Sequence, residues 1–280
     1  MNAGKKAILA VSFGTAVPAT RVATIDVLEN DMRTSFPDWE VRRTFTSGTV
    51  RAKIVAEEGL WTDPPAGALG RLGHDQFREV IIQPTHIIPG DEYDRLTATL
   101  ERFHQAGIFG SLKLGRPLLC SEGSSGRPDD YNIAVEALRA QLPEFSSTDA
   151  ARVVLMGHGS GHVSDRCYDV LQDRFEAAGL PVFTATVEGS RTFGDALEWL
   201  QRSGAGRVVL MPFMLVAGAH AINDMAGPAE DSWQSRLIAA GYQVEPYLRG
   251  LGENPAFRQI YIRHIREAVP FSIGAGRVDR

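Results

Sequence analysis

The chain has 280 residues, enough for one large domain or two medium-sized ones, with 44% apolar and 22% charged residues. This composition is typical of a globular protein with a substantial core. The formal net charge is −5 and no basic run is interleaved with aromatic residues, so we do not expect a nucleic-acid partner.

The sequence also argues against a membrane protein, because no apolar run reaches the roughly 18 residues that a spanning helix needs. The first apolar run, Ala7–Val11, is too short for a secretory signal and predicts a strand. We therefore expect a cytoplasmic protein, or a periplasmic one if an export signal has been removed. Cys120 and Cys167 have no CxxC spacing and are expected to be reduced thiols.

Short apolar runs alternate with helical patterns along the chain. The runs lack period-two alternation, which is typical of buried parallel strands. They are Ala7–Val11, Glu79–Ile82, Val153–Met156 and Arg207–Met211. The patterns between and after them predict helices at Arg21–Ser35, Asp165–Ala178 and Pro255–Ala268, the last with Asn254 as N-cap. Such alternation predicts an α/β fold with helices on both faces of a parallel sheet.

The sequence repeats itself weakly. Ile8–Thr15 resembles Val153–Ser160, and Val80–Pro84 resembles Val208–Pro212 in the same order. In this register Phe13 corresponds to His158, and Glu92 to His220. We therefore expect two similar α/β domains, residues 1–145 and 146–280, divided in the polar stretch 143–149. The last helix could pack back on the first domain.

Ligands of such sheets bind outside the carboxyl ends of the strands. His158 follows a predicted strand between two glycines, which let a large ligand approach the backbone. Glu188 ends the next short strand, Val182–Gly189, and His220 lies in the loop after the following one. Two imidazoles and one carboxylate suit a divalent first-row metal and leave coordination positions open. We expect a metal site here.

Each of these residues has a simpler interpretation. His158 could be structural, Glu188 could be a solvated surface residue, and His220 could begin a helix capped by Asn223 or Asp224. Two other motifs are not favoured. Gly157–Ser160 lacks the G-x-S-x-G of a nucleophile elbow, and Gly157–Gly161 lacks the G-x-G-x-x-G spacing of a dinucleotide site.

The first half offers His86-Ile-Ile-Pro-Gly-Asp-Glu92-Tyr93 at the corresponding strand end. Asp91 and Glu92 could simply cap the helix that follows. Alternatively, His86 and Glu92 could face a ligand that both domains enclose.

These stretches together resemble a known family, the anaerobic sirohydrochlorin cobaltochelatases, which are class II, ATP-independent chelatases of cobalamin biosynthesis. The resemblance covers nearly the whole chain in order. The matching stretches are Val11–Thr15, Phe45–Gly48, His86–Tyr93, Met156–Gly159, Val187–Glu188, Met214–Met225, Asp231–Trp233 and Gly250–Pro255.

The resemblance implies two similar parallel-sheet α/β domains facing across a central cleft. It also implies a metal site of His158, Glu188 and His220, with His158 as the proton acceptor. Cobalt(II) would then be a bound substrate, sirohydrochlorin the other, and no organic cofactor would be required. We also expect a homo-oligomer. The alternatives are iron(II) insertion toward sirohaem and a non-catalytic carrier of metal or tetrapyrrole.

For the macrocycle, we expect contacts from the first half. These residues are Phe13, Gly14, Thr15, His86 and Glu92. Leu215 could add to the apolar wall, and Arg51 and Lys53 could pair with the peripheral carboxylates of the substrate.

Overall fold

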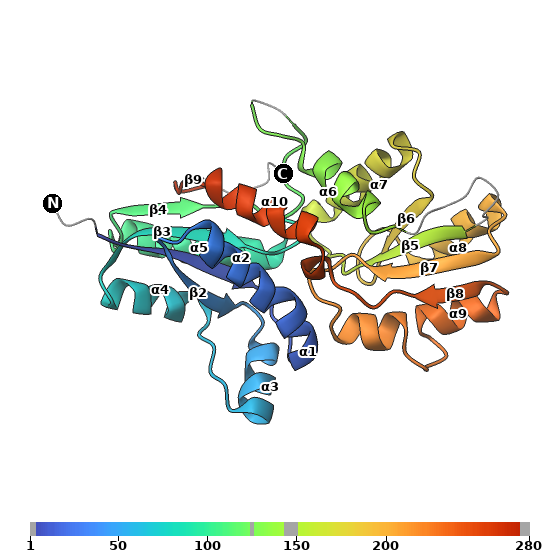
Figure 1. The fold of residues 1–280 in the computed structure, drawn as a ribbon, viewed down its shortest axis with the longest axis horizontal. Helices are drawn as coiled ribbons and strands as arrows, with labels where there is room; N and C mark the ends of the chain where they lie inside the picture. Colours follow the sequence, from blue (N-terminus) through green and yellow to red (C-terminus); the bar gives the residue numbers. More distant parts are fainter. Residues whose placement is uncertain (1–3, 124–125, 143–150, 275–280) are drawn as a thin grey trace. The chain divides into compact units, whose positions relative to one another are not determined.

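The computed structural model describes residues 4–123, 126–142 and 151–274. The chain forms two compact units, one made of the residues up to Cys120 together with those from Arg258 onward, the other of Ser121–Phe257. Each unit contains its own parallel sheet (Figure 1). The fold class expected from the sequence, α/β with two parallel-sheet domains, is confirmed.

The first unit is built on a five-stranded sheet of order β2-β1-β3-β4-β9, parallel except for β9. Its helices and strands are β1 (Lys5–Ser12), α1 (Pro18–Arg21), the π-helix η1 (Val22–Asp26), α2 (Val27–Ser35), β2 (Glu40–Phe45), α3 (Gly48–Glu58), α4 (Pro65–His74), β3 (Phe77–Pro84), α5 (Asp91–Gln105), β4 (Ser111–Leu114), most of α10 (Pro255–Arg266) and β9 (Val269–Pro270).

The second unit is built on a four-stranded parallel sheet of order β6-β5-β7-β8. Its helices and strands are α6 (Asp130–Arg139), β5 (Ala151–Gly157), the 3₁₀ helix η2 (Val163–Arg166), α7 (Cys167–Ala177), β6 (Val182–Thr186), α8 (Phe193–Ser203), β7 (Arg207–Pro212), the π-helix η3 (His220–Met225), α9 (Trp233–Ala239), β8 (Gln243–Pro246) and the 3₁₀ helix η4 (Leu251–Glu253).

Apolar faces of the helices cover both sides of each sheet. In the first unit α4 and α5 pack on one face, through Leu69, Leu72, Leu96 and Leu100, while α10 lies on the other (Figure 1). In the second unit α8 and α9 share one face, and α6 and α7 lie on the opposite side (Figure 1). Burial from both sides explains why the strands are continuous apolar runs. The four predicted strands lie within β1, β3, β5 and β7 and are confirmed.

The predicted helices also form, with small differences at their ends. The Arg21–Ser35 pattern becomes η1 and α2, ending at Ser35, and the Asp165–Ala178 pattern becomes the end of η2 followed by α7. The last helix begins at Pro255, and the Asn254 side chain accepts a hydrogen bond from the Ala256 N–H at 2.9 Å, as an N-cap should. It ends at Arg266, two residues before the expected end.

The division between the units differs from the expected one after residue 145. The expected boundary, 143–149, lies outside the described residues, and the structure divides the chain at Cys120 and again at Arg258. Side-chain contacts explain the difference. Asp129, the N-cap of α6, accepts a hydrogen bond from Arg174 of α7 at 3.1 Å, which ties α6 to the second unit.

The C-terminal helix is tied to the first unit in the same way. Tyr261 and His264 of α10 are fully buried. The Tyr261 hydroxyl donates to the Thr85 carbonyl at 3.0 Å, and His264 bonds the Arg116 carbonyl at 3.0 Å. Arg258 pairs with Asp31 of α2 at 2.6 Å. These contacts join residues more than a hundred positions apart, so no local pattern announces them.

The two units repeat one backbone scaffold. After β1 and β3, the Thr85 N–H donates to the Val11 carbonyl at 2.8 Å; after β5 and β7, the Phe213 N–H donates to the Met156 carbonyl at 2.7 Å. One strand over, the Ser47 N–H bonds the Phe13 carbonyl at 3.3 Å. Its counterpart is the Glu188 N–H, which bonds the His158 carbonyl at 2.9 Å. The internal repeat expected from the sequence is therefore real, and Phe13 and His158 occupy equivalent places in their own units.

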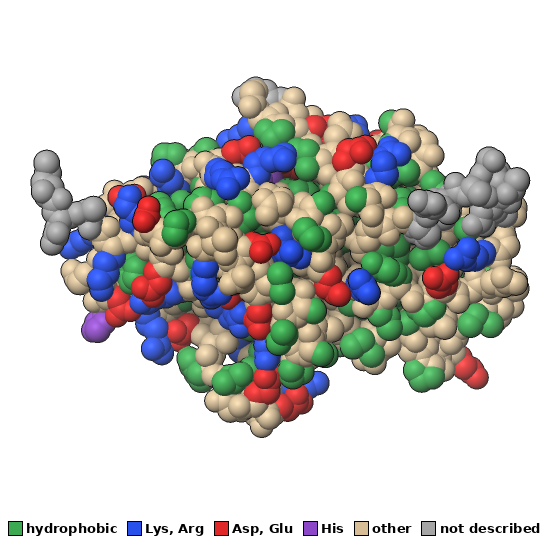
Figure 2. Space-filling model, viewed as in Figure 1, with side chains coloured by type: hydrophobic (Ala, Val, Ile, Leu, Met, Phe, Trp, Pro, Cys, Tyr) green, Lys and Arg blue, Asp and Glu red, His purple; other side chains and the backbone are tan. Residues whose placement is uncertain are grey.

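Charged side chains of both signs are mixed over the face shown in Figure 2, rather than gathered into one patch. Among the described residues no helix is long and apolar enough to cross a membrane.

Candidate metal and catalytic site

His158 lies in the loop directly after β5, where the strand's carboxyl end reaches the edge of the sheet. Its Nδ1 lies 2.9 Å from the carbonyl oxygen of Gly159. Because a carbonyl only accepts hydrogen bonds, Nδ1 carries the hydrogen in this contact and Nε2 presents its lone pair. The residue is half-buried, and Nε2 is the ring nitrogen left for a metal or a proton.

The loop that carries His158 packs against Tyr168 of α7, whose ring is fully buried. A Cβ on Gly157 would lie 2.7 Å from the Tyr168 ring, so the strand end and the ring are in close contact. Burial raises the pKa of the Tyr168 phenol, against hydrogen bonds from the backbone of Gly159 and His158. The neutral phenol therefore supports the backbone on both sides of the His158 side chain.

His220 is the first residue of the π-helix η3, on the segment that follows β7. Its Nδ1 lies 2.5 Å from Oδ2 of Asp224, four residues later in the same helix. A carboxylate accepts this bond, so Nδ1 again carries the hydrogen and Nε2 is the free nitrogen. A carboxylate behind a histidine orients the ring and raises the basicity of the ligand nitrogen, as is common for histidines that bind metals.

The structure brings these two predicted residues together. The ring centroids of His158 and His220 lie 5.0 Å apart, with the ring planes at 84°. The sheet dictates the meeting, because β5 and β7 are paired up to Met156 and Pro212 and their carboxyl ends coincide. Two imidazoles with free Nε2 atoms at one sheet edge can serve as adjacent metal ligands or proton acceptors.

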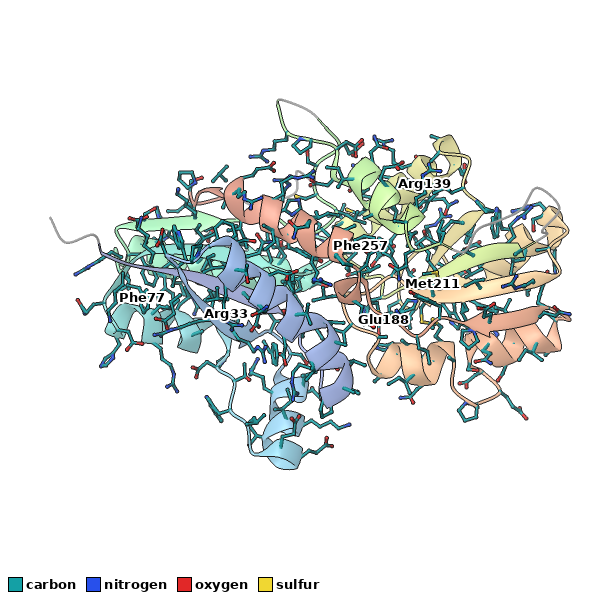
Figure 3. The ribbon with its side chains drawn as sticks, in the orientation of Figure 1. Arg33, Phe77, Arg139, Glu188, Met211 and Phe257 are labelled. Atoms are coloured by element: carbon teal, nitrogen blue, oxygen red, sulfur yellow. The ribbon has the colours of Figure 1, made fainter. Side chains whose placement is uncertain are left out.

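Glu188 follows β6 and lies beside His158 through its backbone N–H, which donates to the His158 carbonyl at 2.9 Å. Figure 3 labels it, together with Met211 of β7 in the same unit. The Glu188 side chain is exposed. Within the described residues, no three His, Cys, Asp or Glu side chains are gathered closely enough to hold a metal ion. The structure therefore joins two of the three predicted ligands and sets the third on the adjacent loop.

In the first unit, Phe13, Gly14 and Thr15 form the loop after β1. Phe13 is 49% exposed, as are several other large apolar residues of this chain, and this exposure leaves its ring open to a ligand. Thr15 is buried, and its hydroxyl oxygen accepts a hydrogen bond from the Val17 N–H at 3.1 Å. Of the three, Phe13 offers the side chain with the largest free surface.

His86 and Glu92 lie on the segment between β3 and α5. His86 retains some exposed surface, but both ring nitrogens are shielded and have no hydrogen-bond partner among the described residues. Burial lowers the pKa of His86 to about 4, so the ring is neutral at neutral pH. Glu92 lies in the first turn of α5 and pairs with Arg95 at 2.8 Å. The N-cap of α5 is Gly90, so Asp91 and Glu92 are first-turn residues rather than the cap expected in the simpler interpretation; a carboxylate there is favourable toward the helix dipole.

The two basic residues considered for the substrate carboxylates are already engaged. Arg51 donates to the backbone carbonyls of Phe45 and Thr46. Lys53 is exposed and pairs with Glu57 on α3 at 3.7 Å. Leu215 is buried, with 9% of its surface exposed.

Three side chains contact His220 or the loops of His158 and Glu188 but were not recognised as such from the sequence: Asp224 bonds His220, Tyr168 packs under Gly157, and Asp165 accepts from the N–H groups of Ser160 and Ser190. Asp224 was considered only as a helix cap, and Asp165 and Tyr168 only as part of a helix. Asp224 had a recognisable signal, because the His-x-x-x-Asp spacing puts the two side chains on one helical face. Tyr168 and Asp165 act on the loops through burial and long-range hydrogen bonds, for which the sequence has no periodic signal.

The chain matches the model of a known protein family. The model of the family described as cobalt chelatase (CbiK) matches residues 6–270. The chain belongs to this family. The resemblance found in the sequence is thereby confirmed.

Two curated relatives carry the more specific name. The chain is 39% identical over 269 residues to the sirohydrochlorin cobaltochelatase of Salmonella typhimurium, covering 96% of this chain and 98% of the relative. It is 36% identical over 265 residues to the sirohydrochlorin cobaltochelatase CbiKC of Nitratidesulfovibrio vulgaris, covering 95% and 91%. These matches span both units, so the similarity is not limited to one repeated half.

Solved structures with the same fold are more distant in sequence. SirB from Bacillus subtilis with Fe³⁺ superposes with a TM-score of 0.60 at 13% identity, covering 94% of this chain and 95% of that one. DR2241 from Deinococcus radiodurans, a multi-domain protein with structural similarity to chelatases, gives 0.57 at 16% identity, covering 99% and 56%. At such identities the likeness concerns the fold alone, and it confirms the class II chelatase-like architecture.

Proposed function

We propose that this protein inserts cobalt(II) into sirohydrochlorin without ATP, as a step of anaerobic cobalamin biosynthesis. The observation that carries the proposal is the pair formed by His158 and His220, whose rings meet at 5.0 Å at one sheet edge. Membership of the cobalt chelatase family and the names of the curated relatives support the choice of metal and macrocycle.

The metal is held by Nε2 of His158, Nε2 of His220 and the carboxylate of Glu188. Both Nδ1 atoms are committed to acceptors, Gly159 and Asp224, which leaves each Nε2 as the donor atom for a metal. Glu188 is exposed on the adjoining loop and approaches by side-chain rotation. Imidazole and carboxylate ligands bind a borderline ion such as cobalt(II) without the tight grip of thiolates, so the metal can be released to the macrocycle.

Insertion also requires a proton acceptor, because two pyrrole N–H protons must leave as the ring nitrogens bind the metal. An imidazole with a pKa near neutrality accepts a proton without a large energetic cost. His158 accepts one of these protons, since its lone pair at Nε2 is freed as the metal transfers from the protein to the macrocycle, and the second proton passes to solvent water. Its hydrogen bond to the Gly159 carbonyl remains intact whether Nε2 is protonated or not.

The first half supplies contacts to the macrocycle. We assign Phe13, Gly14, Thr15, His86 and Glu92 to this role, as expected from the sequence. Phe13 has the strongest support, because its exposed ring can cover an apolar macrocycle face. His86 is neutral at neutral pH, so it suits contact with an uncharged part of the substrate.

The test follows the absorbance of sirohydrochlorin over time under anaerobic conditions, with cobalt(II) or iron(II) and a substoichiometric amount of protein. A chelatase converts many equivalents of macrocycle per protein above the spontaneous rate. Conversion limited to one equivalent per protein would contradict the proposal and indicate a carrier. A higher kcat/KM with iron(II) than with cobalt(II) would instead reassign the metal.

A further inference from the structure

The carboxylate of Asp165 is buried behind the two loops that carry His158 and Glu188. Only 7% of the residue surface is exposed. Oδ1 accepts a hydrogen bond from the Ser160 N–H at 3.1 Å, and Oδ2 accepts from the Ser190 N–H at 2.7 Å and the Ser190 hydroxyl at 2.9 Å. Hydrogen bonds to an ionised acceptor are among the stronger ones in proteins.

These three bonds join two different loops. Ser160 follows β5 two residues after His158, and Ser190 follows β6 two residues after Glu188. One side chain therefore fixes both loops at nearly the same distance from their ligand residues. The backbone bond from the Glu188 N–H to the His158 carbonyl joins the same loops at the ligands themselves.

The loops lie too close together to admit side chains between them. A Cβ on Gly189 would lie 2.4 Å from Oδ1 of Asp165 and 2.5 Å from the Thr186 hydroxyl oxygen. Gly159 has a φ of 76°, and a Cβ there would lie 2.4 Å from the Gly189 nitrogen. Glycine is needed at both positions, because any larger residue would push the Glu188 loop away from the His158 loop.

The first unit has the same loops without this carboxylate. Thr15 matches Ser160, because its hydroxyl accepts from the Val17 N–H at 3.1 Å just as the Ser160 hydroxyl accepts from the His162 N–H at 3.0 Å. In this register Thr20 stands at the place of Asp165, and its hydroxyl donates to the nearby Val17 carbonyl at 3.1 Å. Gly48, the counterpart of Gly189, is uncrowded, since a Cβ there would be 3.7 Å from its nearest neighbour.

We propose that Asp165 is a positioning residue, which holds the Glu188 loop against the His158 loop so that the two side chains can bind one cobalt ion. The inference rests on the proposed function, because it assigns those two residues as ligands. The carboxylate is present only in the half that carries the His-Glu-His set, as a device for metal binding should be. A device for fold stability alone would serve both halves.

The test compares the wild type with Asp165→Asn. Asparagine keeps the shape but replaces one acceptor oxygen with an NH₂ group, which faces an N–H donor from Ser160 or Ser190. Cobalt(II) is titrated into each protein and followed by its visible absorbance and by equilibrium binding, and sirohydrochlorin affinity is measured without metal. We expect the Kd for cobalt to rise about 10–100-fold, as for other residues that orient metal ligands. The macrocycle affinity should stay within about twofold, since a positioning role is local.

Two further variants serve as a partial loss of the same hydrogen bonds and as a control. Ser190→Ala removes one of the three donors and should raise the Kd for cobalt by about threefold, the weight of a single hydrogen bond. Asp173→Asn changes an exposed carboxylate on α7, the helix that follows η2, and should leave cobalt binding unchanged. If Asp165→Asn fails to fold, Ser190→Ala decides, and an unchanged cobalt affinity there overturns the proposal.

The proposal is also overturned if folded Asp165→Asn binds cobalt within twofold of the wild type. A parallel loss of cobalt and macrocycle affinity overturns it as well, because that result indicates a general structural role. His158→Ala distinguishes a failure of the proposed metal site from a failure of the proposed role of Asp165. If it binds cobalt like the wild type, the proposed metal site fails and the role of Asp165 with it. If His158→Ala binds cobalt weakly and Asp165→Asn binds it as tightly as the wild type, the metal site stands and only the positioning role of Asp165 is wrong.

Discussion

The parallel strands of the two units have the same order, with β9 added at the edge of the first sheet, and their loop hydrogen bonds match, but the side chains at the strand ends differ. The places of His158, Glu188 and His220 in the second unit correspond to Phe13, Ser47 and Glu92 in the first. Where one unit has two imidazoles and a carboxylate, the other has an exposed ring, a helix cap and an ion-paired glutamate. In the proposed function, this repeated scaffold serves metal binding in one copy and substrate contact in the other, because function depends on the side chains at the sheet edge.

The largest effect is expected from changing His158 and its counterpart in the first unit, Phe13. We expect His158→Ala to lower kcat by about 10²–10⁴-fold, because both a ligand and a proton acceptor are lost, and excess cobalt should not restore it. Phe13→Ala, the matched change in the first unit, should mainly raise the KM for sirohydrochlorin. Steady-state insertion rates over a wide cobalt range, corrected for spontaneous insertion, provide both values. Full rescue of His158→Ala by cobalt would show that another residue accepts the proton.

A second difference between the units concerns His86, whose counterpart in the second unit is Met214. Burial lowers its pKa from 6.5 to about 4. Above pH 6.5 both the folded and the unfolded states hold a neutral ring, and this residue adds no pH dependence. Between pH 6.5 and 4 only the unfolded state binds the proton, so stability falls as the pH falls, by about 3 kcal/mol in total.

Denaturant unfolding at several pH values measures this effect. We expect the unfolding free energy of the wild type to decline more steeply between pH 6.5 and 4 than that of His86→Asn. His74→Asn is the matched control, because the His74 side chain is 89% exposed. Equal slopes in the wild type and His86→Asn would mean that the ring is protonated in the folded state.

The third comparison concerns His220, a proposed metal ligand, and Asp224, the carboxylate that orients its ring. His220→Ala should raise the KM for cobalt by about 10–100-fold, and a high cobalt concentration should recover most of the rate, because the loss is mainly one of ground-state binding. Asp224→Asn should cause a smaller change in the same direction, since the ring remains but loses the carboxylate that orients it. A fall in kcat that cobalt cannot restore would assign His220 to proton transfer as well.

The sequence predicted the scaffold well, because the physical causes of the scaffold are local. Strands buried on both faces are apolar throughout, and Asn254 before Pro255 marks a helix start. It also predicted that His158 and His220 would lie at one edge, because the carboxyl ends of parallel strands meet at the same edge of a sheet. The inference needed only the topology and the position of each residue relative to its strand.

The features that the sequence did not predict depend on contacts between distant residues, which no local pattern encodes. The division of the units depends on pairs such as Arg258 with Asp31, 227 positions apart. The support of the site depends on which of many carboxylates is buried, and nothing next to Asp165 in the sequence distinguishes it from the exposed Asp169 and Asp173. The π-helical form of η3, which begins at His220, is likewise not visible as a period in six residues.

The smallest predicted effect concerns Ser47 and Glu188, which share one backbone place but have different tasks. The Ser47 hydroxyl oxygen accepts a hydrogen bond from the Val50 N–H at 3.2 Å and caps α3. Ser47→Ala should therefore lower the unfolding free energy by about 1 kcal/mol and leave the Kd for cobalt unchanged. Glu188→Ala should leave the unfolding free energy nearly unchanged, because an exposed carboxylate adds little to stability. It should raise the Kd for cobalt, because a proposed ligand is lost. Thermal unfolding and cobalt titration of the two variants measure both quantities. If Ser47→Ala weakens cobalt binding as much as Glu188→Ala does, the metal site is not confined to the second unit, and the division of tasks between the two halves is wrong.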